Sequence, residues 1–178
     1  SEYDRSGDHP NPAVVDLERL GLIAADRIVA VSHLTASVLR ERYEADGERI
    51  RVVHNAVVQD VDAERLAATK AIPDPVVLFL GRVTFQKGPE YFLEAAKRVL
   101  EIRPDTRFVM SGSGDMRPGM IEHAARIGIG RQVHFTGFLE GDDVGRMYEM
   151  ADLYVMPSVS EPFGITPLEA MSLDVPVI

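Results

Sequence analysis

From Val76 onward, short apolar segments alternate regularly with longer amphipathic ones, and this alternation constrains the fold more than any other feature of the chain. The apolar segments have the length and composition of buried strands and cover residues 76–80, 107–110, 132–135, 153–156 and 175–178. Helices are expected between them, starting near Pro89, Arg117, Asp142 and Pro167. Such an order favours a parallel sheet with right-handed crossovers and helices on both faces. We therefore predict an α/β, Rossmann-like domain.

Local signals place further elements. Asn11-Pro12 has the residue types of an N-cap and a first helical position, so a helix is expected to open there. Strands are expected at 27–31 and 50–53, with a helix over 32–43 between them. Residues 60–75 contain alanines and charges and end in two prolines, which predicts a short helix and then a linker at 71–75. In the helix from Pro89, the spacing predicts a buried stripe of Phe92, Ala95, Ala96, Val99 and Leu100.

Composition narrows the possible partners. The chain has 178 residues, of which 46% are hydrophobic, enough for a buried core. Its net charge of −9 argues against a nucleic-acid-binding or anionic-membrane surface, since both need a basic face. It has no cysteine, which excludes disulfides and thiolate metal sites. No apolar run approaches the ~20 residues that span a bilayer. We expect a soluble, cytoplasmic protein.

Two loops that follow predicted strands carry candidate ligand groups. Arg82 follows the strand at 76–80, Lys87 comes five residues later, and Gly88-Pro89 opens a helix. Ligands of open α/β sheets bind beyond the carboxyl ends of the strands, and cations with helix N–H groups suit a diphosphate. In the next such loop, Gly112 would let the backbone approach a ligand closely. The alternatives are two solvated cations and an ordinary turn.

Two glutamates lie eight positions apart near the carboxyl end, at Glu161 and Glu169. Between them, a glycine turn leads into a helix whose first amides have no intrahelical partner and attract anions. Thr166-Pro167-Leu168-Glu169 is also a possible capping box, in which Thr166 is the N-cap and Glu169 reaches back to it. Glu161, before a proline, could equally be a plain surface carboxylate.

This E-x7-E pattern closely resembles that of the glycogen-synthase-like retaining glycosyltransferases, glycosyltransferase family 4, which have the GT-B fold. Other motifs similar to that family, in its order, are Gly81-Arg82, Lys87-Gly88 and the segments 111–114, 135–138 and 151–158. Segments 25–32 and 52–57 resemble the end of the family's amino-terminal domain. The resemblance implies that residues 1–70 end this domain and that 76–178 form the donor-binding domain. We expect the chain to be a fragment, truncated at its end.

The same resemblance implies roles for individual residues. Arg82 and Lys87 would bind the donor diphosphate and, with Glu161 at the donor sugar, would act in catalysis. Glu169 would hold the ribose hydroxyls, and Phe138 and Leu139 would contact the nucleobase. Gly112, Phe163, Gly164, Ile165 and Thr166 would complete the donor site. The five histidines show no metal-ligand spacing, and the family uses cations and a helix N-terminus in place of a divalent ion.

The resulting prediction is a retaining transferase that moves a hexose from a nucleoside-diphosphate sugar to the hydroxyl of a sugar or other acceptor. It would need neither a cofactor nor a metal. Two alternatives stay open: a sugar-nucleotide epimerase on the same fold and, for this chain alone, a non-catalytic nucleotide-sugar-binding module. The family's acceptor cleft lies in the amino-terminal domain, so we expect the isolated chain to bind a nucleoside diphosphate weakly and to transfer no sugar.

Overall fold

The computed structural model describes residues 2–3, 9–57 and 72–178. Its contacts divide the chain into two compact units. The first contains Ser1–Ala56 and Ser160–Ile165, and the second contains Val57–Val159 and Thr166–Ile178. The short helix expected within 60–75 falls largely outside the described residues, so the domain boundaries drawn around 71–75 stay a prediction.

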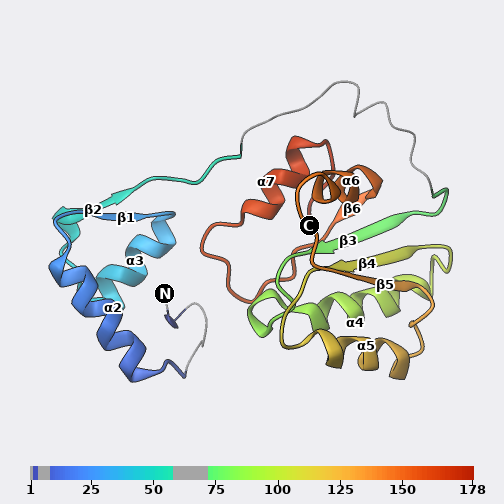
Figure 1. The fold of residues 1–178 in the computed structure, drawn as a ribbon, viewed down its shortest axis with the longest axis horizontal. Helices are drawn as coiled ribbons and strands as arrows, with labels where there is room; N and C mark the ends of the chain where they lie inside the picture. Colours follow the sequence, from blue (N-terminus) through green and yellow to red (C-terminus); the bar gives the residue numbers. More distant parts are fainter. Residues whose placement is uncertain (1, 4–8, 58–71) are drawn as a thin grey trace. The chain divides into compact units, whose positions relative to one another are not determined.

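The first unit is built on two short parallel strands (Figure 1). Helix α2 (Pro12–Ala24) opens as expected, because the Asn11 side chain accepts a hydrogen bond from the Ala13 amide. Strand β1 (Ile28–Ala30), helix α3 (His33–Tyr43), the 3₁₀ turn η1 (Gly47–Arg49) and strand β2 (Ile50–Val52) follow. The core of this unit consists of Val15, Ile28, Ala30, Ala36, Leu39, Tyr43 and Ile50.

The second unit is a four-stranded, fully parallel sheet in the order β5-β4-β3-β6. Its strands are β3 (Val76–Leu80), β4 (Arg107–Ser111), β5 (Val133–Gly137) and β6 (Leu153–Tyr154). The connections contain η2 (Phe85–Lys87), α4 (Pro89–Leu100), α5 (Arg117–Arg126), α6 (Asp142–Met150) and α7 (Ile165–Ser172).

Helices cover both faces of this sheet, with α4 and α5 on one face and α6 and α7 on the other (Figure 1). Successive β3 side chains point to opposite faces, as the pleat requires. Phe79 packs with residues of α4 and α5, whereas Val76 and Leu78 pack with Tyr148 of α6 and Ala170 of α7. The predicted α/β fold with a parallel sheet and helices on both faces is confirmed.

Two details of the second unit differ from expectation. In α4 the buried positions include Phe92, Leu93 and Ala96, while Ala95 and Val99 are exposed. The stripe of the helix that faces the sheet therefore lies next to the predicted one. The last expected strand is reduced to a single bridge between Tyr154 and Val177. Pro176 has no N–H group to donate, which limits the pairing of this short segment. Its carbonyl accepts from the Tyr154 amide at 2.8 Å.

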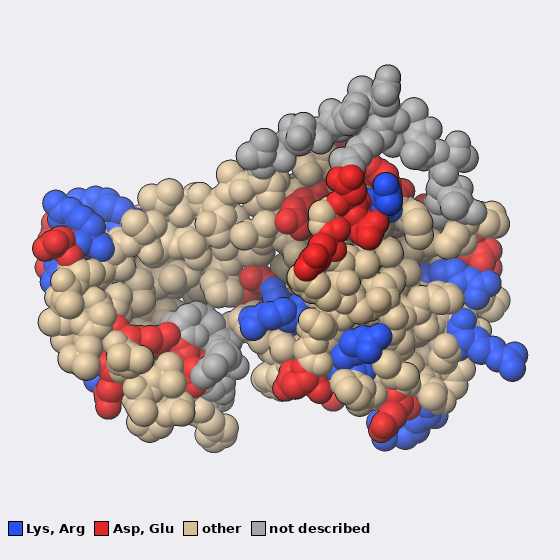
Figure 2. Space-filling view, in the orientation of Figure 1, with Lys and Arg blue, Asp and Glu red and all other residues tan. Residues whose placement is uncertain are grey.

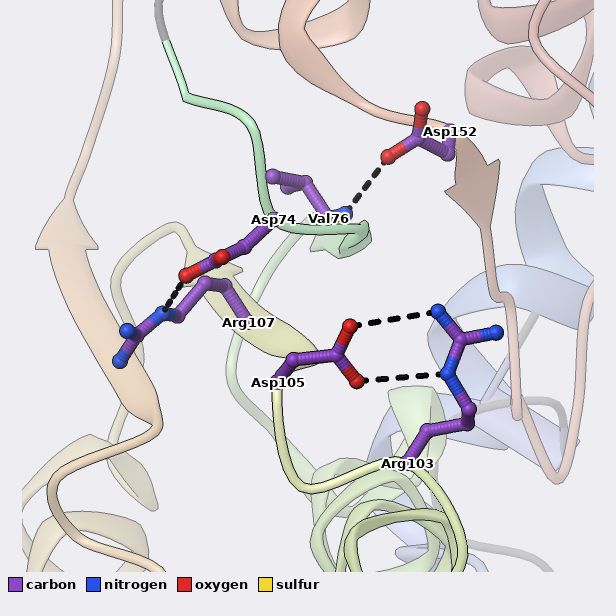
Figure 3. Close-up of polar contacts among 6 residues, drawn as sticks. All are labelled: Asp74, Val76, Arg103, Asp105, Arg107 and Asp152. Carbon is purple, nitrogen blue, oxygen red and sulfur yellow. Dashed lines mark hydrogen bonds and ion pairs between the residues drawn. The ribbon is translucent and has the colours of Figure 1, made fainter.

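Carboxylates fix the amino-terminal ends of the strands (Figure 3). Asp152 accepts a hydrogen bond from the buried Val76 amide at 2.7 Å, while its own amide donates to the Val76 carbonyl at 2.9 Å. Asp74 pairs with Arg107 at 2.8 Å, at the start of β4. In the turn before β4, hydrogen bonding to Arg103 lowers the pKa of the Asp105 carboxyl. These contacts lie at the edge of the sheet opposite to the strand-end loops.

Replacing Asp152 by Ala is expected to lower the free energy of unfolding by about 1–3 kcal/mol, because the buried Val76 amide would lose its acceptor. Asp152→Asn keeps a carbonyl oxygen at this position and should lose much less. Chemical denaturation measures both. Nucleotide affinity should stay unchanged in both variants, and equal losses of stability for Ala and Asn would show that the hydrogen bond is not the cause.

Candidate functional site

The loop that follows β3 carries Arg82 and Lys87 at the carboxyl edge of the sheet. It is tied to the loop after β4, because the amides of Gly81 and Val83 donate to the carbonyls of Ser111 and Ser113 at 3.0 and 2.9 Å. The Arg82 guanidinium is exposed and lies 3.4 Å from the Gln86 side-chain oxygen. Lys87 ends the 3₁₀ turn η2 and is half-buried. The chain therefore leaves both cations at the edge where α/β sheets bind ligands.

Gly88 fixes the point where this loop enters α4. Its φ of +63° is in the left-handed region, and a Cβ atom there would lie 2.2 Å from the Pro157 carbonyl oxygen. The Val159 amide also donates to the Gln86 carbonyl at 3.0 Å. The loops after β3 and β6 are thus packed backbone against backbone, which only glycine permits at position 88.

Gly112 has the same kind of role between β3 and β4. Its φ is +137°, and a Cβ atom would lie 1.8 Å from the Gly81 carbonyl oxygen. Its amide donates to the Gly137 carbonyl at 2.7 Å. The sequence predicted a close backbone approach here, with a ligand as the neighbour. The structure places the Gly81 backbone at that point, while a ligand contact of Gly112 stays a prediction.

A pocket of about 210 Å³ opens between these strand ends. It is lined by Leu80, Gly81, Arg82, Ser111, Gly112, Ser113, Phe138, Leu139 and Val144. Four predicted donor-site residues therefore come together: Arg82, Gly112, Phe138 and Leu139. Phe138 is 69% exposed. Its exposed ring, the apolar walls and one guanidinium could hold a flat, weakly polar ring next to an anionic group.

Helix α7 begins at Ile165, two residues before the expected start at Pro167. A capping box would need Thr166 at the N-cap, which does not match this start. Instead, the Tyr154 hydroxyl donates to Thr166 Oγ1 at 2.7 Å, and the Tyr148 hydroxyl donates to Glu169 Oε2 at 3.0 Å. Neither tyrosine contact is visible in the sequence, because tyrosines at helical or strand spacing among apolar residues are typical of a buried core.

The remaining predicted residues, Glu161, Phe163, Gly164 and Ile165, belong to the first unit, whereas the other seven belong to the second. The Phe163 ring stacks on the His54 imidazole, with centroids 5.7 Å apart. His54 follows β2 and bonds through Nδ1 to the Val31 carbonyl at 3.1 Å. Gly164 is buried with a φ of +80° and directly precedes α7.

On the face shown in Figure 2, Lys and Arg lie among Asp and Glu, and the described residues of that face show no continuous basic patch. Within the described residues, no group of three His, Asp or Glu side chains could hold a metal ion. None of the described helices has the length and apolar character that crossing a membrane requires.

A Rossmann-like parallel sheet with a pocket, two cations and two glycine-dependent backbone contacts at its carboxyl edge defines a class of α/β ligand-binding domains. The sequence pattern of a family described as Glycosyl transferases group 1 matches residues 60–178, well over half of the chain. The chain belongs to this family, as its motifs predicted.

Curated relatives agree with this assignment. The chain is 32% identical over 176 residues to an uncharacterized glycosyltransferase of Methanocaldococcus jannaschii, covering 93% of the chain and 45% of that protein. It is 35% identical over 180 residues to a D-inositol 3-phosphate glycosyltransferase of Mycobacterium sp., covering 97% and 41%. A 2-deoxystreptamine glucosyltransferase of Streptomyces kanamyceticus is 32% identical over 176 residues, covering 94% and 46%. The chain thus spans less than half the length of these relatives.

Solved structures share the fold. HepE of Anabaena, in complex with UDP and glucose, superposes with a TM-score of 0.83 at 20% identity, over 97% of this chain and 49% of that one. Sucrose-phosphate synthase of Thermosynechococcus elongatus gives a TM-score of 0.82 at 23% identity, over 98% and 46%.

Proposed function

We propose that the whole protein is a retaining glycosyltransferase that moves a hexose from a nucleoside-diphosphate sugar to an acceptor hydroxyl. The observation that carries this proposal is the pocket at the ends of β3 and β4, which joins Arg82 to the apolar residues Phe138 and Leu139. A nucleotide has the matching pair of groups, a flat base and an anionic diphosphate. The names of the curated relatives and the UDP-glucose bound to HepE support the same donor class.

In this proposal the four charged residues of the predicted site have chemical roles. Arg82 and Lys87 bind the donor diphosphate through charge-assisted contacts. The amides at the start of α7 add donors, and Glu169 binds the ribose hydroxyls. Glu161 faces the donor sugar.

The reaction breaks the bond between the anomeric carbon and a diphosphate oxygen, and forms a bond from that carbon to the acceptor oxygen. The proton of the acceptor hydroxyl passes to the departing diphosphate, whose oxygen becomes basic as its bond to the anomeric carbon breaks. Negative charge develops on the leaving diphosphate, so fixed cations beside it stabilise the transition state more than the ground state. Arg82 and Lys87 therefore take the part that a divalent ion has in other transferases, and no metal is needed.

Calorimetry of the whole protein with UDP, ADP and GDP in EDTA tests the donor class and the metal independence together. We expect at least one of the three to bind, with an affinity that added magnesium leaves unchanged. Incubation with the corresponding sugar nucleotide and candidate acceptors should then give a product whose anomeric configuration, read by NMR, matches the donor. Binding that appears only with magnesium or manganese would refute the metal-independent part, and an inverted product would refute retention.

A further inference from the structure

Two buried tyrosines of the second unit direct their hydroxyls at the first turns of α7. Tyr148 comes from α6 and Tyr154 from the end of β6, and each is 1% exposed. Their rings pack edge to face, with centroids 5.8 Å apart. The Tyr154 hydroxyl lies 2.7 Å from Thr166 Oγ1 and 3.2 Å from the Leu80 carbonyl. The Tyr148 hydroxyl lies 3.0 Å from Glu169 Oε2 and 3.1 Å from the Thr166 carbonyl.

Tyr148 holds one of the two oxygens of the Glu169 carboxylate. A phenol carries one proton, and an ionised carboxylate only accepts, so the phenol donates to the carboxylate. Hydrogen bonds to charged acceptors are stronger than those to neutral carbonyls, which favours Glu169 over Thr166 as the acceptor. Oε1 of Glu169 has no hydrogen-bond partner among the described residues, and the side chain is half-buried. One carboxylate oxygen is therefore anchored while the other is available to a ligand.

Tyr148 stays a donor over the whole range in which proteins are assayed. Burial raises the pKa of its phenol well above the ordinary value, and the negative charge of Glu169 raises it further. The phenol therefore keeps the proton that it donates to Glu169 at neutral pH.

We infer that Tyr148 is a positioning residue for nucleotide binding: it anchors Glu169 Oε2 so that Oε1 faces the ribose hydroxyls. This inference rests on the proposed role of Glu169 as the ribose ligand. A glutamate side chain loses several rotatable bonds of freedom when it binds, and an anchored one has already lost them. Removing the Tyr148 hydroxyl should thus weaken the ribose contact without touching the diphosphate or the base.

The test compares UDP with 2′,3′-dideoxy-UDP, which lacks the ribose diol, in calorimetry of the whole protein. The ADP and GDP pairs are run alongside, and the tightest-binding parent is used. Tyr148→Phe keeps the buried ring and should weaken binding of the parent nucleotide about fivefold, with less than about a twofold change for the dideoxy form. If Tyr148→Phe weakens the binding of both nucleotides equally, or leaves both affinities unchanged, the inference is wrong.

Tyr154→Phe is the matched control, because it removes the same hydroxyl from an equally buried ring, one that donates to Thr166 Oγ1 at 2.7 Å. Any loss in this variant should be the same for both ligands. Thermal unfolding of both variants shows whether they fold alike. If Tyr148→Phe does not fold, the wild-type Tyr148 hydroxyl proton can be followed by NMR, and only the ligand with the diol should shift it.

Glu169→Gln separates the inference from the proposed function. If Glu169→Gln leaves the difference in affinity between the parent and the dideoxy nucleotide unchanged, Glu169 is not the ribose ligand. That part of the proposed function then fails. If Glu169→Gln removes this difference in affinity and Tyr148→Phe does not reduce it, only the positioning role of Tyr148 fails. In the double variant, Tyr148→Phe should add no further loss that depends on the ribose.

Discussion

Replacing Arg82 or Lys87 by Ala should weaken the affinity of the whole protein for a nucleoside diphosphate at least tenfold. Each change removes a charge-assisted contact of about 1.5–3 kcal/mol from the loop between β3 and α4. Calorimetry measures the loss directly. Because the interaction is between charges, the difference from wild type should shrink as the salt concentration rises.

Lys97→Ala and Arg103→Ala are the matched controls for these two variants. They change the net charge equally, but Lys97 lies in the last turn of α4 and Arg103 in the turn before β4, away from the strand-end loops. Their nucleotide affinities should stay within about twofold of wild type. Unchanged affinity in both Arg82→Ala and Lys87→Ala would exclude these residues as diphosphate ligands, and an equal loss in the controls would point to net charge.

Gly112→Ala should destabilise the protein by about 2–5 kcal/mol, the largest stability effect expected here. A Cβ atom would lie 1.8 Å from the Gly81 carbonyl oxygen, and φ is +137°. The neighbouring atom is backbone, so relief requires the loops after β3 and β4 to separate. Because the β3 loop carries Arg82, nucleotide affinity should fall as well. Chemical denaturation and calorimetry measure the two effects.

Gly119→Ala is the control for Gly112→Ala. Gly119 lies in α5, and a Cβ atom there would meet nothing within 4 Å. Alanine in a helix is favoured over glycine by about 0.5–1 kcal/mol, so this variant should be as stable as wild type or slightly more so. A Gly112→Ala protein with wild-type stability would contradict the backbone contact between the two loops.

The sequence alone determined the features of this protein that depend on neighbouring residues. Alternating segments predicted the parallel sheet, and the N-cap Asn11 and the first-turn proline Pro89 placed two helix starts correctly. The motifs led to the family that the comparisons show. These signals are short-range, since periodicity, turn residues and caps act over a few positions. Ligands of open α/β sheets bind at the carboxyl ends of the strands, which predicted that Arg82, Gly112, Phe138 and Leu139 lie at one edge of the sheet. In the structure these four residues line one pocket at that edge.

Tertiary structure decided the features that depend on distant partners. Leu93 is buried and Val99 exposed because of how α4 rests on the sheet, which helical spacing alone does not fix. The need for glycine at position 112 comes from Gly81, across two neighbouring strands. Tyr148 and Glu169 are 21 residues apart, and nothing in the local pattern of either one names the other. A buried hydroxyl must find an acceptor, but only the packing of α6 against α7 determines which acceptor lies within reach.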